Sequence, residues 1–335
     1  MIIYDNIEFW NVAELKKSPY QSGLFLMRYP ESLIENIDSE PANIMLKKAS
    51  GIELRFKTEN ARSRLYLKST EGDQIIQIYK GDFLVREEIL KAGITSCVSL
   101  YHEANFRDRI EALPKETKGS FVFSPDVWRV VLGHSDIFYE GLDTGKFKAV
   151  SPGENDKPKV KWLAYGSSIT QANYDGYVHY AAHLLGWDVM NKGMAGSCYC
   201  EPAIVDYLCS IDFNIMTMEL GINMRDSISV EDFEKRVKNL IHTIQQKHSE
   251  KPLLVIDLYE NFATGTDSEI DHKDRAYREV LDRTVSDLNA KNVHRIEAKE
   301  IMDDFRCLSA DLVHPTRFGH ARMGANLAQI LKNYI

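Results

Sequence analysis

The sequence is poor in cysteine and has no repeated cysteine spacing. Its 335 residues include five cysteines, an odd number, and only Cys198 and Cys200 lie close together. No second pair and no neighbouring histidine completes a zinc-binding set. The sequence therefore predicts reduced thiols, with neither a disulfide framework nor a structural metal site.

Long apolar runs and an excess of basic residues are also lacking. No stretch is long enough to span a membrane, and residues 1–8 lack the basic and apolar regions of a secretory signal. The formal net charge of −8 disfavours nucleic acid and anionic membranes as partners. We therefore expect a cytoplasmic protein with no nucleic-acid or membrane partner. The sequence does not predict its oligomeric state.

The composition is that of a globular protein, and the chain is long enough for two domains. Its first half alternates with period two: Ile52, Leu54 and Phe56 share one face of segment 51–57, and charged residues share the other. Similar short runs recur between turn residues. This pattern predicts an antiparallel β-sandwich accessory domain over residues 1–150.

A polar segment bracketed by prolines, residues 151–159, is the expected linker. From residue 160 to 335, short apolar strands alternate with helical stretches, and the stretch 230–247 carries one apolar stripe. Alternation of this kind indicates an α/β domain with a parallel sheet covered on both faces. In such sheets ligands bind beyond the carboxyl ends of the strands.

Four blocks in this half carry glycines or polar residues at predicted strand ends: residues 166–170 (Gly-Ser-Ser-Ile-Thr), Gly196, residues 221–223 (Gly-Ile-Asn) and residues 311–314 (Asp-Leu-Val-His). Glycine permits tight turns in which backbone N–H groups approach a ligand. A carboxylate three residues before a histidine can turn back to accept its Nδ1–H. Each block alone also suits an ordinary turn, helix cap or surface pair.

Together and in this order, the blocks resemble the signature of the SGNH (GDSL-like) serine hydrolases. The resemblance covers residues 160–335 and implies a flavodoxin-like parallel sheet. It implies Ser168 as the nucleophile, His314 as its general base and Asp311 as the residue that orients His314. It also implies an oxyanion hole formed by the backbone N–H groups of Ser168 and Gly196 and the side-chain amide of Asn223.

Two positions depart from the family pattern, because Ser167 and Met224 stand where an aspartate is common. These departures indicate a divergent branch and remove no atom that the chemistry needs. The first half is similar to the jelly-roll-like domain that precedes the hydrolase domain in several SGNH carbohydrate esterases and acyltransferases. There the extra domain can shape the substrate cleft; a packing domain without ligand contact is the alternative.

The resemblance implies a serine esterase that cleaves a small, acetyl-like acyl ester of a carbohydrate or another polar alcohol through an acyl-enzyme. No cofactor and no metal is expected. Two alternatives stay open: an acyltransferase that uses the same triad, and a glycan-binding protein with an inactive hydrolase domain. The expected partner is a small-molecule or carbohydrate ester. Candidate substrate contacts lie in loops after the strands: Asn173, Tyr174, Arg225, Tyr259 and Phe262.

Overall fold

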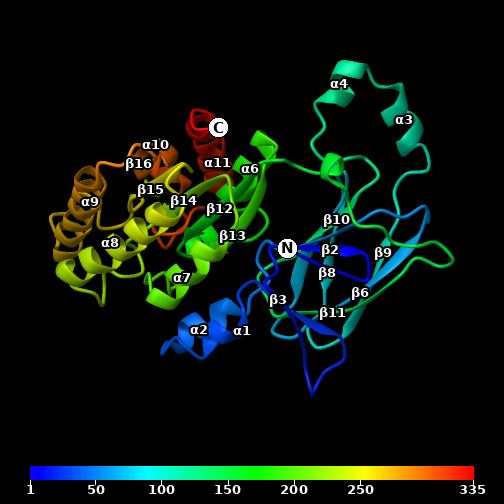
Figure 1. The fold of residues 1–335 in the computed structure, drawn as a ribbon, viewed down its shortest axis with the longest axis horizontal. Coiled ribbons are helices and arrows are strands. Elements are labelled where there is room, and N and C mark those ends of the chain that lie inside the picture. The colour runs from blue at the N-terminus through cyan, green and yellow to red at the C-terminus, as the bar shows by residue number, and fades with distance from the viewer. The chain divides into compact units, whose positions relative to one another are not determined.

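A computed structural model describes all residues of the chain, 1–335, and they divide into two compact units (Figure 1). Unit 1 comprises Met1–Glu31 and Leu46–Lys159, and unit 2 comprises Ser32–Met45 and Val160–Ile335. Residues 32–45 thus make their contacts within unit 2 although they lie early in the sequence. The domain bounds 1–150 and 160–335, with a linker at 151–159, stay a prediction.

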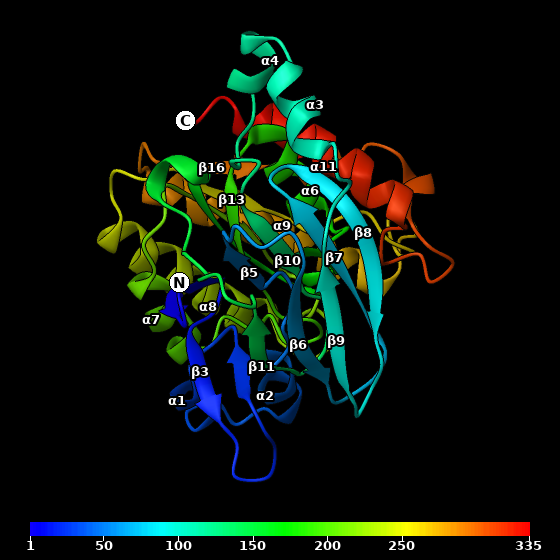
Figure 2. The same ribbon diagram turned by 90° about the vertical axis from the view of Figure 1, so that its right-hand side faces the viewer.

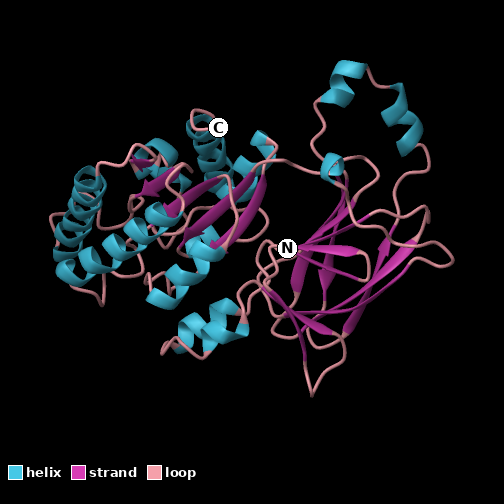
Figure 3. Ribbon diagram, in the orientation of Figure 1, coloured by secondary structure: helices cyan, strands magenta, loops and turns pink.

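Unit 1 contains two antiparallel sheets, whose strands are seen in Figure 2 and are drawn in magenta in Figure 3. One sheet has six strands: β1 (Ile2–Tyr4), β2 (Ile7–Trp10), β5 (Glu53–Phe56), β10 (Trp128–Val131), β7 (Gln74–Lys80) and β8 (Phe83–Leu90). The other has five: β3 (Glu14–Lys17), β4 (Leu24–Met27), β11 (Ile137–Asp143), β6 (Ser63–Ser69) and β9 (Thr95–Leu100). Side chains of both sheets share one apolar core, so the predicted antiparallel β-rich domain is confirmed.

The alternation read from the sequence builds this core, but the second face of β5 differs from expectation. Leu54 and Phe56 are fully buried in the core, as period two requires. Glu53 and Arg55, on the other face, are also buried, with 7% and 1% of their surface exposed. Arg55 Nε donates to Glu53 at 2.8 Å, and Arg129 Nη2 donates to the same carboxylate at 2.9 Å. Buried charges persist there because each has an oppositely charged partner.

Two short helices interrupt the strands of unit 1, which the sequence pattern did not predict. They are α3 (Phe106–Ala112) and α4 (Lys115–Gly119), and they connect β9 to β10 (Figure 1).

Unit 2 is an α/β fold with a five-stranded parallel sheet, as predicted. In spatial order its strands are β13 (Asp188–Gly193), β12 (Lys161–Gly166), β14 (Ile215–Glu219), β15 (Leu253–Ile256) and β16 (Val293–Ile296). Its helices are α1 (Glu31–Ile34, which begins at the last residue of unit 1), α2 (Glu40–Leu46), α5 (Ser168–Gln171), α6 (Tyr177–Leu185), α7 (Pro202–Ser210), α8 (Val230–Lys247), α9 (Glu269–Leu288), α10 (Ala298–Ile301) and α11 (Arg317–Leu331). No helix combines the length and the apolar character that a membrane crossing requires.

Helices cover both faces of the parallel sheet. Strand residues such as Trp162 and Ile256 share a core with α6, α10 and α11. On the other side α8 packs against α7 and α9 (Figure 1). The apolar stripe predicted for 230–247 is the buried face of α8, and Ser229 caps this helix by accepting the N–H of Asp232. The helices therefore cover the faces of the sheet, and the loops follow its strands at the edge.

Candidate active site

Three adjacent strands bring the predicted site residues to one edge of the parallel sheet. β12 pairs with β13 on one side and with β14 on the other, in parallel register. Ser168 follows β12, Gly196 follows β13 and Asn223 follows β14. Because parallel strands end at the same edge, the three loops emerge together.

Ser168, His314 and Asp311 form a continuous hydrogen-bonded relay. Ser168 is the first residue of α5, and its Oγ lies 2.8 Å from His314 Nε2. His314 Nδ1 lies 2.7 Å from Asp311 Oδ2. A proton on Nδ1 directed at Asp311 leaves Nε2 as the acceptor for the serine hydroxyl. The fold thus brings together a hydroxyl and an imidazole that are 146 residues apart.

The loop that carries Asp311 and His314 holds the carboxylate in its ionised form. Burial raises the pKa of Asp311, but hydrogen bonds from the His314 backbone and ring, the Val313 N–H and the Ser309 hydroxyl lower it well below the ordinary value. Leu312, between them, has a φ of 53°, a conformation that bulky side chains rarely adopt. The turn that folds Asp311 back onto His314 is therefore locally strained.

The groups expected to hold an oxyanion are oriented by their neighbours. Ser167 caps α5 by accepting the N–H of Ile169, which leaves the Ser168 N–H at the open helix start. Gly196 has a φ of 66° and is exposed. Neither the Ser168 N–H nor the Gly196 N–H donates to an acceptor within the protein. Asn223 Oδ1 accepts the N–H of Cys198 at 3.1 Å. Because this contact fixes which end of the amide faces Cys198, the NH₂ group at the other end is left to donate to a different acceptor.

Residues 159–332 match the model of the GDSL-like lipase/acylhydrolase family. The chain belongs to this family. The resemblance drawn from the four sequence blocks is thereby confirmed, as is the assignment to enzymes that act on ester bonds. Comparison with the curated proteins finds no match.

Solved structures share the fold of this GDSL-like protein at low sequence identity. A salicylyl-acyltransferase from a tetracycline biosynthetic pathway is similar with a TM-score of 0.80 and 13% identity, covering 98% of this chain and 94% of that one. A putative GDSL-like lipase from Bacteroides ovatus has a TM-score of 0.69 and 15% identity, with 98% of both chains covered. A family two carbohydrate esterase from Clostridium thermocellum, in complex with cellohexaose, has a TM-score of 0.60 and 16% identity, covering 85% of this chain and 92% of that one.

A buried carboxyl group beneath the GDSL-like serine was not singled out from the sequence. Glu219, the last residue of β14, is 1% exposed. Its Oε2 accepts the N–H of Ser167 at 2.7 Å and the hydroxyl of Thr170 at 3.2 Å, whereas its Oε1 has no partner. Burial raises the pKa of Glu219 despite these bonds. A glutamate at the end of a largely apolar strand, just before the Gly221 block, was the available signal.

The same contacts explain the glycine at the start of the serine block. A Cβ on Gly166 would lie 2.4 Å from Thr170 Oγ1 and 2.7 Å from Glu219 Oε2. Only glycine lets β12 pass this close to the buried carboxyl group. Gly166 therefore serves close packing against Thr170 and Glu219.

The five candidate substrate contacts fall into two groups. Asn173 is exposed and Tyr174 half-buried in the loop between α5 and α6, and Phe262 is 44% exposed. The Phe262 N–H donates to Leu312 O at 2.9 Å, which fixes it beside the Asp311–His314 loop. Arg225 and Tyr259 are instead buried, with 6% and 2% of their surface exposed.

Arg225 is engaged within unit 2 and not directed to solvent. Its Nη1 donates to Asn261 Oδ1 at 3.0 Å and to Asp274 Oδ2 at 3.2 Å. In this position the guanidinium ties the loop after β14 to the loop after β15. Arg225 thus connects the site loops, and Tyr259 packs edge-to-face on Tyr177 with ring centroids 6.0 Å apart. All five residues stay predicted substrate contacts.

The site contains no group of histidine, cysteine and acidic side chains arranged as metal ligands. All five cysteines are free thiols, and burial raises the pKa of Cys198. A raised pKa keeps this thiol protonated and unreactive.

Proposed function

We propose that this protein is a serine esterase that removes a small, acetyl-like acyl group from a carbohydrate or another polar alcohol. The observation that carries the proposal is the relay from Ser168 Oγ through His314 to Asp311. It supplies a nucleophile, a base and an orienting carboxylate in hydrogen-bond contact, which is the arrangement that activates a serine hydroxyl.

In the proposed first half-reaction, Ser168 Oγ attacks the acyl carbon as His314 Nε2 takes its proton. The carbonyl oxygen of the ester becomes negatively charged and accepts hydrogen bonds from the oxyanion donors of Ser168, Gly196 and Asn223. The tetrahedral intermediate then expels the alcohol, which receives the proton from His314. The acyl group is left on Ser168 Oγ, and the charge on the imidazole is balanced by Asp311 until the proton leaves.

In the second half-reaction, water replaces the alcohol. His314 takes a proton from the water molecule, whose oxygen attacks the acyl carbon, and the collapse of the second intermediate breaks the bond to Ser168 Oγ. The acid is released, and the proton returns from His314 to the serine. No external oxidant, reductant or metal is required to balance these steps.

Hydrolysis is favoured over transfer to a second alcohol by the exposure of the relay. The side chains of His314 and Asp311 are 48% and 50% exposed. An enzyme that protects its acyl intermediate for another acceptor has to exclude water from the reacting groups. The similarity to the salicylyl-acyltransferase keeps acyl transfer as the alternative outcome of the test.

The preference for a carbohydrate or other polar alcohol is supported by the fold neighbours that match most of this chain's length. Besides the Clostridium enzyme, these include a family two carbohydrate esterase from Cellvibrio japonicus and an acetyl xylan esterase from Butyrivibrio proteoclasticus. The fold alone does not fix a substrate. We therefore take the acylated saccharide as the first substrate class to test.

The test is a panel of acetylated mono- and oligosaccharides and acetylated simple alcohols, with release of acetate as the readout. We expect turnover by the wild-type protein and none above background by Ser168→Ala. Product analysis with added acceptor alcohols separates the two reactions, because an acyltransferase would form a new ester in preference to free acid. Equal acetate release by both proteins would disprove the serine mechanism.

A further inference from the structure

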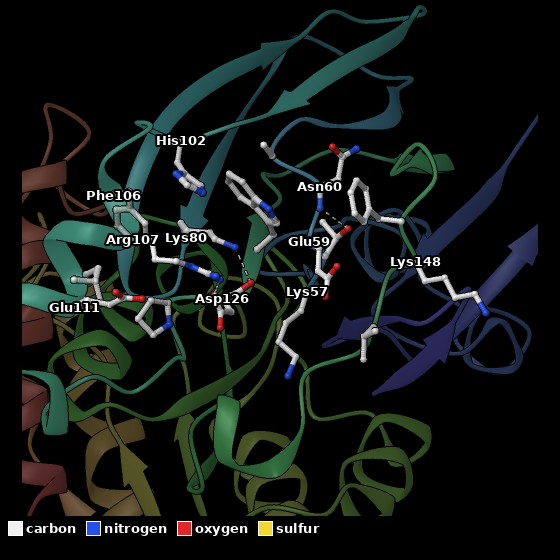
Figure 4. A pocket seen from close by; sticks show the side chains of 17 residues that line it. Lys57, Glu59, Asn60, Lys80, His102, Phe106, Arg107, Glu111, Asp126 and Lys148 are labelled. Carbon is white, nitrogen blue, oxygen red and sulfur yellow. Dashed lines mark hydrogen bonds and ion pairs between the residues drawn. The ribbon is translucent and has the colours of Figure 1, made fainter.

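Unit 1 contains a large open groove that the proposed ester chemistry does not use. Its volume is about 1170 Å³, and it is lined by the β5–β6 connection, the end of β7, helix α3 and the segments before β10 and after β11 (Figure 4). This is more space than a single small ligand needs. A second hollow of about 520 Å³ shares Asn60 with it, so the lining continues along the surface of unit 1.

The groove contains a buried cation that forms no ion pair with a carboxylate. Lys80, at the end of β7, is 6% exposed. Its Nζ donates to the backbone oxygen of Asp126 at 2.7 Å and lies 4.8 Å from the centre of the Trp128 ring. Burial is the main reason that the pKa of Lys80 falls to about 8. An ammonium group taken out of water without an ionic partner is costly, so this geometry favours an anion supplied from outside.

The carboxylate of Asp126, whose charge acts on Lys80, is already bound by a second cation. Arg107 Nη2 lies 2.5 Å from Asp126 Oδ1, and Figure 4 shows Lys80 and Arg107 converging on Asp126 from neighbouring sides. The Arg107 side chain is 70% exposed and retains N–H groups for another acceptor. Its planar fork suits a ligand carboxylate.

Flat rings lie beside these cations. His102 lies 5.1 Å from Phe106 and 5.8 Å from Trp128, measured between ring centroids. Phe106 and His102 are only half-buried, so part of each ring is open to the groove. Rings and planar polar groups together suit a ligand that has both apolar faces and hydrogen-bonding edges.

The charge of the lining limits how densely charged the ligand can be. The lining includes four cations (Lys57, Lys80, Arg107 and Lys148) but also three carboxylates (Glu59, Glu111 and Asp126). The whole chain carries a net charge of −8. A nucleic acid, with a phosphate at each nucleotide, would be repelled by this field. A chain with sparse carboxylates fits better.

We propose that this groove binds an acidic oligosaccharide through a carboxylate that pairs with Lys80 and Arg107. The sugar rings lie against His102 and Phe106, and the length of the lining accommodates several sugar units. This binding needs no group of the Ser168 relay, so it can be tested independently of the proposed ester chemistry.

The experiment is isothermal titration calorimetry on the full chain carrying Ser168→Ala, which prevents turnover during the titration. The ligands are a xylo-oligosaccharide that carries one glucuronic acid, the same oligosaccharide without the acid, and a single-stranded oligonucleotide. We expect binding of the acidic oligosaccharide only. Equal binding of the neutral oligosaccharide, stronger binding of the oligonucleotide, or no binding of the acidic oligosaccharide would overturn the proposal.

Variants then locate the site. Arg107→Gln should weaken binding of the acidic oligosaccharide at least about tenfold, the loss expected for a charge-assisted carboxylate contact. Arg109→Gln is the matched control, because Arg109 lies on the same helix, is exposed and does not line the groove. Lys80→Met should abolish binding with thermal unfolding little changed. If Lys80→Met fails to fold, the Arg107→Gln variant still tests the site, because Arg107 is exposed. A loss of affinity in Arg107→Gln no larger than that in Arg109→Gln overturns the assignment.

Discussion

Replacing Glu219 tests whether the buried carboxyl group positions the nucleophile. In Glu219→Ala, the Ser167 N–H and the Thr170 hydroxyl lose their shared acceptor, Oε2. The buried Ser167 N–H is then unsatisfied, whereas the Thr170 hydroxyl still has Tyr177 Oη at 2.8 Å as a partner. One unsatisfied buried donor costs about 1–3 kcal/mol, so the free energy of unfolding should fall by roughly that amount. Because Ser167 caps the helix that begins at Ser168, the hydroxyl should also lose its alignment with His314.

The activity loss follows from this misalignment. A displacement of about 1 Å at a reacting group can cost on the order of a hundredfold in rate. We therefore expect kcat of Glu219→Ala to fall about 10–100-fold on an acetyl ester, with a smaller change in KM. Steady-state kinetics at a temperature where circular dichroism shows the variant folded separates this effect from unfolding.

Glu219→Gln is the matched control, because it keeps a carbonyl oxygen in the position of Oε2 and mimics the neutral acid. Burial raises the pKa of Glu219 above its ordinary value of 4.5, so the folded state binds this proton more tightly than the unfolded chain does. The contribution of this proton to wild-type stability is then fully present below pH 4.5 and declines as the pH rises through the higher folded pKa. As the pH rises through that pKa, denaturant unfolding should show that the wild type loses stability relative to Glu219→Gln. A Glu219→Gln variant as inactive as Glu219→Ala, with no pH-dependent difference in stability, would refute this reasoning.

Three further substitutions probe the same site. Asn223→Ala should lower kcat about 10²–10³-fold on acetyl esters with little change in KM, since it removes an oxyanion donor, and unchanged kcat would exclude that role. Asp311→Asn should lower kcat by about 10⁴-fold, because the amide no longer selects the Nδ1–H tautomer of His314; steady-state assays measure the loss, and a loss below about tenfold would contradict it. Gly166→Ala should destabilise the protein by about 1–3 kcal/mol in denaturant unfolding, because its Cβ meets Thr170 Oγ1 and Glu219 Oε2. If Gly166→Ala were as stable as the wild type, α5 would have to move to make room for the new Cβ, which would contradict the packing argument.

The parts of the fold that follow from local periodicity were predictable from the sequence. Period two identified the core face of β5, and the apolar stripe of 230–247 is the buried face of α8. Parallel strands place the loops after β12, β13 and β14 at one edge of the sheet. That Ser168 and His314 meet was implied by the resemblance of the four blocks, in their order, to the SGNH signature.

What depends on contacts between distant residues was not predictable. Glu53 accepts from Arg55 within β5 and from Arg129 on the neighbouring strand β10, and nothing in the alternation of β5 distinguishes a paired buried charge from a solvated one. The burial of Arg225 could not be foreseen because its partner Asp274 lies 49 residues further on. Glu219 was missed for the same reason, since its role appears only when Ser167 and Thr170 fold over it.

The most direct test of the central claim is labelling with a fluorophosphonate, followed by mass spectrometry of the proteolytic peptides. Such reagents modify a serine only when a neighbouring base activates its hydroxyl. We predict a single adduct on the peptide that contains Ser168, abolished by Ser168→Ala and strongly slowed by His314→Ala in folded protein. Absence of the adduct in the wild type, or equal labelling of the His314→Ala variant, would contradict the account.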